Sequence, residues 1–257
     1  MSRAHVHALY VHEHSRAHRL PPHVKIIALL AFTVCVATTP NESLVAFGGL
    51  ALLVAFAAAV ARLPARYLLA RLAVVTPFLL VALLLPFVAS GPRTTFVGVP
   101  LATAGLWGAL GLGARAVLGA AASLVLVATT EVAALLRGLE RLRVPRLITA
   151  IAAFMLRYLE VVADEFMRQR RAMVARGYDP RSLWQARVLA TGMGTLFIRA
   201  YERGERVYAA MRARGFTGAM PVLHHESAAS PGDWGRALVL PAAAFGVRLV
   251  DALVVGV

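Results

Sequence analysis

The sequence predicts an all-α protein: a polytopic membrane helical bundle with about five spans and long amphipathic cytoplasmic helices. Hydrophobic residues make up 59% of the 257 residues and charged residues only 16%, whereas soluble domains carry about a quarter charged residues. Apolar residues also do not alternate with polar ones, as they do in the strands of an outer-membrane barrel. Five uncharged runs approach the length of about 20 residues with which a helix crosses a bilayer: 26–41, 43–61, 72–92, 94–114 and 116–130.

The charge balance is strongly basic and limits the chemistry of the chain. It holds 27 basic and 13 acidic residues, a net charge of +14, and Lys25 is the single lysine. A P-loop needs a lysine directly after a glycine to hold nucleotide phosphates, whereas Lys25 follows Val24. We therefore expect no Walker A motif and no enzyme, with any ATP chemistry on a partner. The basic excess of so apolar a chain is assigned to cytoplasmic loops that face anionic lipid, not to nucleic acid.

Residues 1–24 are predicted to form a cytoplasmic His-rich arm. The arm is polar, ends near Pro21 and Pro22, and contains six of the eight histidines: His5, His7, His12, His14, His18 and His23. A secretory signal is the alternative, but the polar lead is long for one. Pairs of these imidazoles would suit Ni²⁺ or Co²⁺. We favour an arm without bound metal, so no metal site is predicted in this chain.

The membrane region, 25–130, is predicted to contain four spans, near 25–39, 44–61, 68–90 and 112–130. The arm and the turn around 62–71 are rich in basic residues, whereas the turns at 38–43 and 91–100 hold none and one. The positive-inside rule then places the amino terminus in the cytoplasm. The Gly-rich stretch 101–111 is expected to lie along the outer surface. Arg115 is expected at the outer end of a short span, snorkelling to the interface.

Residues 131–222 are predicted to form cytoplasmic helices. Apolar residues recur every three or four positions. Pro145 suits a first helical turn and Gly177 suits the position after a last one, so a helix is expected over 146–176. A second amphipathic helix follows and is expected to end at Gly215.

The charged residues of the carboxyl-terminal half are assigned to ion pairs along single helices. Glu202 and Arg206 are in i,i+4 register, and three acidic residues share a helix with two arginines: Glu160, Asp164 and Glu165 with Arg157 and Arg168. A last span is predicted at 234–257. There Arg248 and Asp251 share a face, where they either neutralise each other or face the bundle interior. No nucleophile, histidine and acid have a suggestive spacing, so no catalytic residue is predicted.

A seven-residue repeat marks the two predicted helix ends. The segment 172–178, AMVARGY, is matched 38 residues later by the segment 210–216, AMRARGF. Arginine in a last turn and glycine after it are typical of ordinary capping. Two copies on the same predicted side of a membrane favour two equivalent docking points for paired partners. Alanine permits close approach, arginine forks onto carboxylates or carbonyls, and glycine turns the chain away; the predicted docking residues are Ala175, Arg176, Gly177, Ala213, Arg214 and Gly215.

Further patterns lie around these two signatures. Residues 15–25 read SRAHRLPPHVK before the first span, Thr129-Thr130 closes the fourth, and the segment 139–145, LERLRVP, precedes Arg157-Tyr158. With these patterns the chain resembles, over most of its length, the transmembrane coupling (T) component of energy-coupling factor (ECF) transporters. The resemblance is closest to the cobalt and nickel uptake (CbiQ-like) subclass.

The resemblance implies a subunit of an ABC-type importer. Two ATP-binding cassette subunits would dock on the two Ala-Arg-Gly ends. ATP and Mg²⁺ would bind to those partners, and this chain would hold no cofactor. A separate substrate-binding membrane subunit would take up Co²⁺ or Ni²⁺. The protein would be a multi-pass protein of a prokaryotic cell (inner) membrane, with its amino terminus and its coupling helices, 131–222, in the cytoplasm.

Two alternatives stay open at this point. One is a coupling subunit that serves a vitamin transporter. The other is a self-contained membrane carrier or channel, which would need titratable groups inside its spans. Arg115, Arg248 and Asp251 are the only candidates for such groups.

Overall fold

The structure, a computed structural model, describes residues 15, 17–90, 92–96, 99–178, 186–216 and 229–255. These residues form two compact units. One unit holds the described residues up to Gly138 and those from 229 onward, and the other holds those from Leu139 to Phe216. The histidines of the arm up to His14, and His224 and His225, lie outside the described residues.

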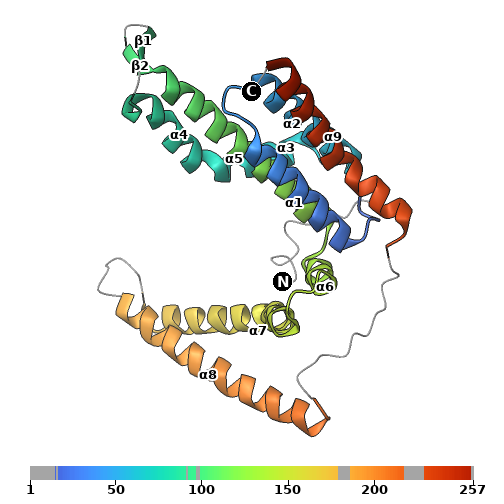
Figure 1. Cartoon of the computed structure of the whole chain (residues 1–257). Coiled ribbons are helices and arrows are strands. Elements are labelled where there is room, and N and C mark those ends of the chain that lie inside the picture. Colours follow the sequence, from blue (N-terminus) through green and yellow to red (C-terminus); the bar gives the residue numbers. More distant parts are fainter. Residues whose placement is uncertain are drawn as a thin grey trace. The chain divides into compact units, whose positions relative to one another are not determined.

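The first unit is a bundle of apolar helices with one short hairpin (Figure 1). Its elements, in chain order, are α1 (Pro22–Thr38), α2 (Leu44–Val60), α3 (Ala65–Leu72), the 3₁₀ turn η1 (Ala73–Val75), α4 (Thr76–Val88), β1 (Arg93–Phe96), β2 (Val99–Ala102), α5 (Thr103–Thr129), the part of α6 (Val132–Arg141) up to Gly138, and α9 (Pro231–Val255). The strands pair antiparallel, with Arg93 opposite Ala102. This hairpin departs from the all-α expectation, although helices form almost all of the rest.

Two helices among the described residues are long and apolar enough to cross a membrane, Ala65–Val88 and Thr103–Thr129. The first of them is continuous through α3, η1 and α4. Helices α1 and α2 are equally apolar but shorter. All four predicted spans thus coincide with apolar helices, and the predicted fifth span coincides with α9. A count of five membrane crossings stays a prediction.

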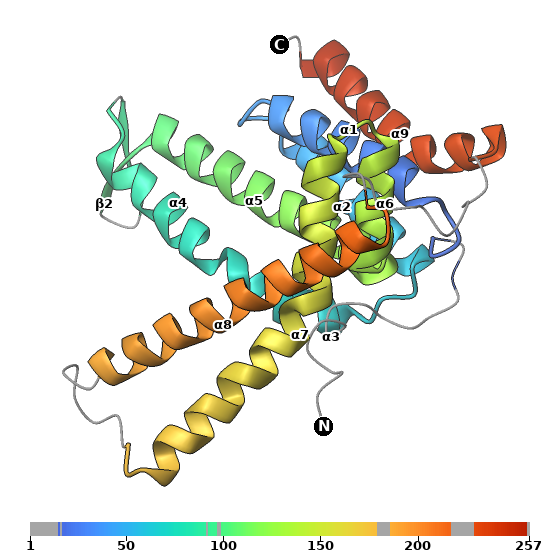
Figure 2. The same cartoon turned by 90° about the horizontal axis from the view of Figure 1, so that it is seen from below.

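The expectation for 101–111 is wrong. Helix α5 is continuous from Thr103 to Thr129, so residues 103–111 are the first part of a helix that begins directly after β2. The physical reason is close packing of α5 on α4, which lie side by side in Figures 1 and 2. A side chain at Gly105 would meet the Leu85 carbonyl oxygen and Pro86 Cα, each at 2.7 Å. Here glycine serves helix–helix contact and does not interrupt the helix.

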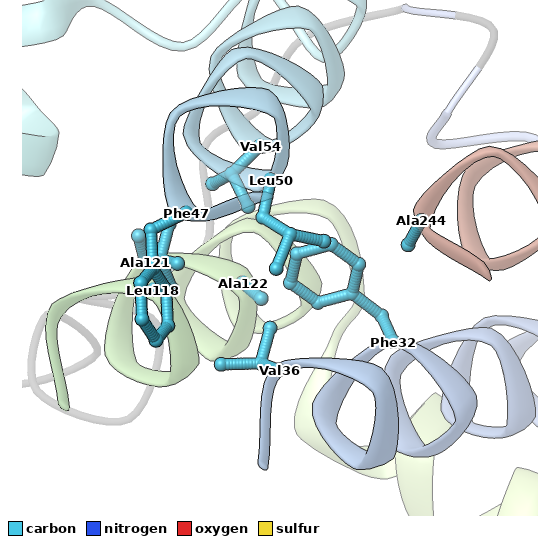
Figure 3. Close-up of a cluster of buried hydrophobic side chains, with 9 residues drawn as sticks. All are labelled: Phe32, Val36, Phe47, Leu50, Val54, Leu118, Ala121, Ala122 and Ala244. Carbon is cyan, nitrogen blue, oxygen red and sulfur yellow. The ribbon is translucent and has the colours of Figure 1, made fainter. Parts of the chain in front are cut away.

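The centre of the first unit is a cluster of buried side chains from α1, α2, α5 and α9 (Figure 3). Phe32 is fully buried and Leu50 is 1% exposed. They face small residues on the neighbouring helices, Ala121 and Ala122 of α5 and Ala244 of α9. Large side chains from two helices thus fill the space left by alanines on two others, which is how close-packed interiors are built.

The outward faces of the same helices are also apolar. On α4, Phe78, Leu83 and Phe87 are all more than half exposed. So large a contiguous apolar surface is unusual on a soluble monomer. It fits helices that are surrounded by lipid, in agreement with the composition.

Candidate functional site

The end of α7 (Arg146–Ala175) has the geometry that the repeat predicts. Arg176 is the C-cap residue and Gly177 has a φ of +84°. The Gly177 amide donates to the Val174 carbonyl and the Tyr178 amide donates to the Met173 carbonyl, each at 3.0 Å. This pair of bonds is a Schellman motif, which satisfies carbonyls that the helix leaves without an intrahelical partner.

The end of α8 (Ala186–Ala213) repeats this geometry. Gly215 has a φ of +83°, its amide donates to the Arg212 carbonyl, and the Phe216 amide donates to the Met211 carbonyl, again at 3.0 Å each. The pattern of side-chain exposure along the repeat is also the same at both helix ends. In both copies the methionine and the aromatic residue are half-buried, and the four residues between them are exposed. The prediction of two equivalent helix ends is confirmed; their role in docking is not tested by this geometry.

The arginines of the two ends are presented to solvent. Arg176 and Arg214 are both exposed. Within the part of the chain that the structure describes, neither guanidinium takes part in a hydrogen bond or an ion pair. No side chain at Gly177 or Gly215 would meet an atom within 4 Å. Glycine is therefore favoured by the positive φ and not by crowding.

Helices α7 and α8 run antiparallel where they contact each other. Glu165 of α7 binds Arg199 of α8 at 2.7 Å, and eight residues nearer the α7 tip, Met173 lies against Gly192. The two tips therefore lie at opposite ends of the pair (Figures 1 and 2). Since α8 has 28 residues, at about 1.5 Å per residue the tips are about 40 Å apart. The six predicted docking residues thus form two separate sites.

Glu165 is the residue that joins the two helices electrostatically. It accepts hydrogen bonds from Arg168 of its own helix at 2.5 Å and from Arg199. These two bonds hold the pKa of the Glu165 carboxyl below its ordinary value, and the bond from Arg168 has the larger effect. The expected pair along α7 is confirmed. Its extension to Arg199 could not be found from i,i+4 spacing, because the partner lies on another helix.

The sequence patterns before the first span and at the end of the fourth meet in the structure. Lys25, in the first turn of α1, donates to the Thr129 carbonyl at 2.9 Å and to the Thr130 hydroxyl at 3.1 Å. It also reaches the His18 carbonyl at 3.4 Å. Nearby, Ala17 packs beside Ala128. The two patterns therefore form one polar junction between the ends of α1 and α5.

Arg115 lies within α5 and not at the end of a short span, which corrects that expectation, and its guanidinium has a defined partner. Its guanidinium donates to the Thr39 carbonyl at 2.5 Å, beyond the last residue of α1, and stands over the Phe47 ring at 5.9 Å. A cation at a helix carboxyl end is favoured by the helix dipole. The pair between Arg248 and Asp251 is confirmed at 3.5 Å, as is that between Glu202 and Arg206 at 3.9 Å. No group of three metal-binding side chains occurs among the described residues.

The chain is similar to known transport proteins over most of its length. The family model described as cobalt transport protein, CbiQ, matches residues 13–225. A cobalt transport protein CbiQ from Rhodobacter capsulatus is 34% identical over 226 residues, which are 87% of this chain and 89% of the relative. Energy-coupling factor transporter transmembrane proteins EcfT from Heliobacterium modesticaldum and Bacillus selenitireducens are 31% and 29% identical, over 81% of this chain and 83% and 82% of theirs.

Proposed function

Because the chain belongs to the cobalt transport protein (CbiQ) family, we propose that it couples ATP hydrolysis on two partner ATPases to the uptake of Co²⁺ or Ni²⁺. Membership makes it the membrane component of an ECF-type transporter. The proposal adds the partners and the cargo: two ATP-binding cassette subunits and a separate substrate-binding membrane subunit. It also places the amino terminus and the α7–α8 unit in the cytoplasm of a prokaryotic cell, below the inner membrane.

The observation that carries the proposal is the pair of matching helix ends. Each end presents an exposed Ala-Arg-Gly corner with the same two backbone bonds. Two equivalent surfaces about 40 Å apart suit two similar partners, one at each end. An arginine fork binds a carboxylate or phosphate in two parallel hydrogen bonds, so each partner is expected to offer an acidic residue in a groove. The choice of Co²⁺ or Ni²⁺ rests on the names of the relatives.

Reversal of charge at the tips tests the docking role. We expect the double variant Arg176→Glu, Arg214→Glu to insert into membranes normally but to lose the co-expressed ATPase subunit during purification. Each single variant should retain one of the two ATPases. The matched control reverses one exposed arginine on each helix outside the signatures, Arg170→Glu with Arg206→Glu, and should retain both. Normal co-purification of the tip variant would contradict the proposal.

A further inference from the structure

An arginine occupies a backbone position that normally requires glycine at the corner between α2 and α3. Arg62 has a φ of +57°. Its amide donates to the Ala59 carbonyl at 2.9 Å, and the Leu63 amide donates to the Ala58 carbonyl at 3.0 Å. This is the same Schellman geometry as at the two tips, where glycine is used. A left-handed conformation strains any residue with a Cβ, so Arg62 adopts a backbone conformation that its side chain disfavours.

The surrounding residues hold the corner in place and turn Arg62 outward. Leu63 is 8% exposed and lies in a small cluster with Ala61 and Ala128. Tyr67 and Leu68, in the first turn of α3, pack against the same cluster. The inner face of the corner is therefore fixed by apolar contacts. Arg62 and Arg66 are left exposed on the outer side.

The exposed side chains that follow these two arginines along α3 and η1 are apolar. Leu69 is 70% exposed, and Val74 in the following 3₁₀ turn is 77% exposed. Both belong to the Ala65–Val88 segment, which is long and apolar enough to cross a membrane. The arginines thus stand at the start of this segment, where a side chain with an apolar stem and a charged head extends to the level of the lipid headgroups.

Nothing in the neighbouring chain neutralises the two arginines. The sequence holds no acidic residue between Glu42 and Glu131, and among the described residues no ion pair involves Arg62 or Arg66. Arg71, the third arginine of the segment, is engaged elsewhere, because its guanidinium stacks over the Tyr67 ring at 4.3 Å. Arg62 and Arg66 are therefore available to an anion from outside this part of the chain.

We propose that Arg62 and Arg66 hold the phosphate of an anionic phospholipid at the α2–α3 corner. Arginine binds phosphate through paired N–H donors, and the exposed apolar face of α3 would lie along the acyl chains of the same lipid. The end of α6 has matching bonds with Arg143 at a φ of +63°. Helix α7, which follows it, is not one of the two described segments that are long and apolar enough to cross a membrane. The proposal is independent of ATPase docking.

The test measures which lipids the full chain retains. The protein is purified from mixed micelles with equal amounts of phosphatidylcholine and phosphatidylglycerol, and bound lipids are quantified by mass spectrometry. We expect phosphatidylglycerol to be enriched. The enrichment should fall about fivefold for each arginine removed in Arg62→Gly and Arg66→Gln, from the attraction of a basic side chain to an anionic surface. Glycine suits a positive φ, so Arg62→Gly preserves the corner, and its melting temperature should not fall.

The control removes the same charge elsewhere, with Arg170→Gln and Arg206→Gln, and should retain the enrichment. Excess inorganic phosphate separates a lipid site from a site for a free anion, because it should leave the lipid in place. Equal enrichment in the corner variant and the wild type would overturn the proposal. So would displacement of phosphatidylglycerol by inorganic phosphate, or an enrichment that falls as far in the control.

Discussion

The ammonium group of Lys25 lies 2.9 Å from the carbonyl oxygen of Thr129, the last residue of α5, which is 104 positions away in the chain. A hydrogen bond from a charged donor to a helix carboxyl end is favoured by the helix dipole. The contact joins α1 to α5 next to the point at which α5 ends and the chain continues to α6. The single lysine of the sequence is therefore a structural residue.

Removal of this ammonium group should destabilise the bundle. We expect Lys25→Met to lower the free energy of unfolding by about 1.5–3 kcal/mol, because hydrogen bonds to a charged group are lost and a buried carbonyl loses its donor. Titration with a denaturing detergent, followed by circular dichroism, measures the change. Arg19 is exposed and close in sequence, so Arg19→Met serves as the control and should change little. Equal stability of Lys25→Met and the wild type would show that the contact is dispensable.

A side chain at either tip glycine should destabilise the helix end. Gly177→Ala and Gly215→Ala place a Cβ at a φ above +80°, which costs about 1–2 kcal/mol per residue. The terminal turn should fray, and ATPase association should weaken with it. Gly204 lies inside α8, and a side chain there would meet nothing within 4 Å. Gly204→Ala should therefore stabilise the helix by about 0.5–1 kcal/mol and leave association unchanged; a similar loss in all three variants would refute the argument.

The Glu165 carboxylate should hold α7 and α8 in one arrangement. We expect Glu165→Gln to broaden the distance between spin labels at Ala172 and Ala210, which are equivalent positions of the repeat. The labels are placed in a Cys35→Ser background, since Cys35 is the only cysteine. Glu202→Gln removes an exposed carboxylate that pairs only weakly, at 3.9 Å, and should not broaden it. In an Arg199→Gln background, Glu165→Gln should broaden the label distance no further. An undiminished broadening there would show that Glu165 acts through Arg168 and not through Arg199.

The same carboxylate predicts a pH dependence. The folded-state pKa of Glu165 is lowered by Arg168 and Arg199, so its contribution is complete above the unfolded pKa of about 4.3. It is lost as the pH falls through the lower folded value. The label distances in the wild type should thus broaden only in acid, whereas Glu165→Gln should show no such transition. Broadening of the wild type as the pH rises above neutrality would contradict this sign.

Arg115 should matter for the end of α1. Arg115→Met removes the donor to the Thr39 carbonyl and is expected to lower the free energy of unfolding by about 1–3 kcal/mol. If the side chain merely reached the interface, the apolar replacement would be neutral or favourable in a bilayer. The detergent titration described for Lys25 distinguishes these outcomes.

The sequence carries the local features of this fold and not its distant contacts. The helix predicted over 146–176 is α7, Arg146–Ala175. It could be predicted because a proline at its start, the apolar periodicity along it and a glycine at its end are all local sequence signals. The same holds for the helix ends at Gly177 and Gly215. Two contacts leave no periodic trace, since their partners lie on other helices: that of Lys25 with Thr129 and that of Glu165 with Arg199. The start of α5 was misplaced because glycines that serve packing, such as Gly105, resemble glycines that break a helix.

The Schellman bonds at each tip close within six residues and need no support from the rest of the protein. The conformation of each tip therefore depends on local hydrogen bonds alone, and any helix of adequate length could end in it. The seven-residue segments 172–178 and 210–216 should then be exchangeable between α7 and α8 without a change in the packing of either helix. A partner that distinguishes the two tips would have to recognise the parts of α7 and α8 that precede the repeat, where the two sequences diverge.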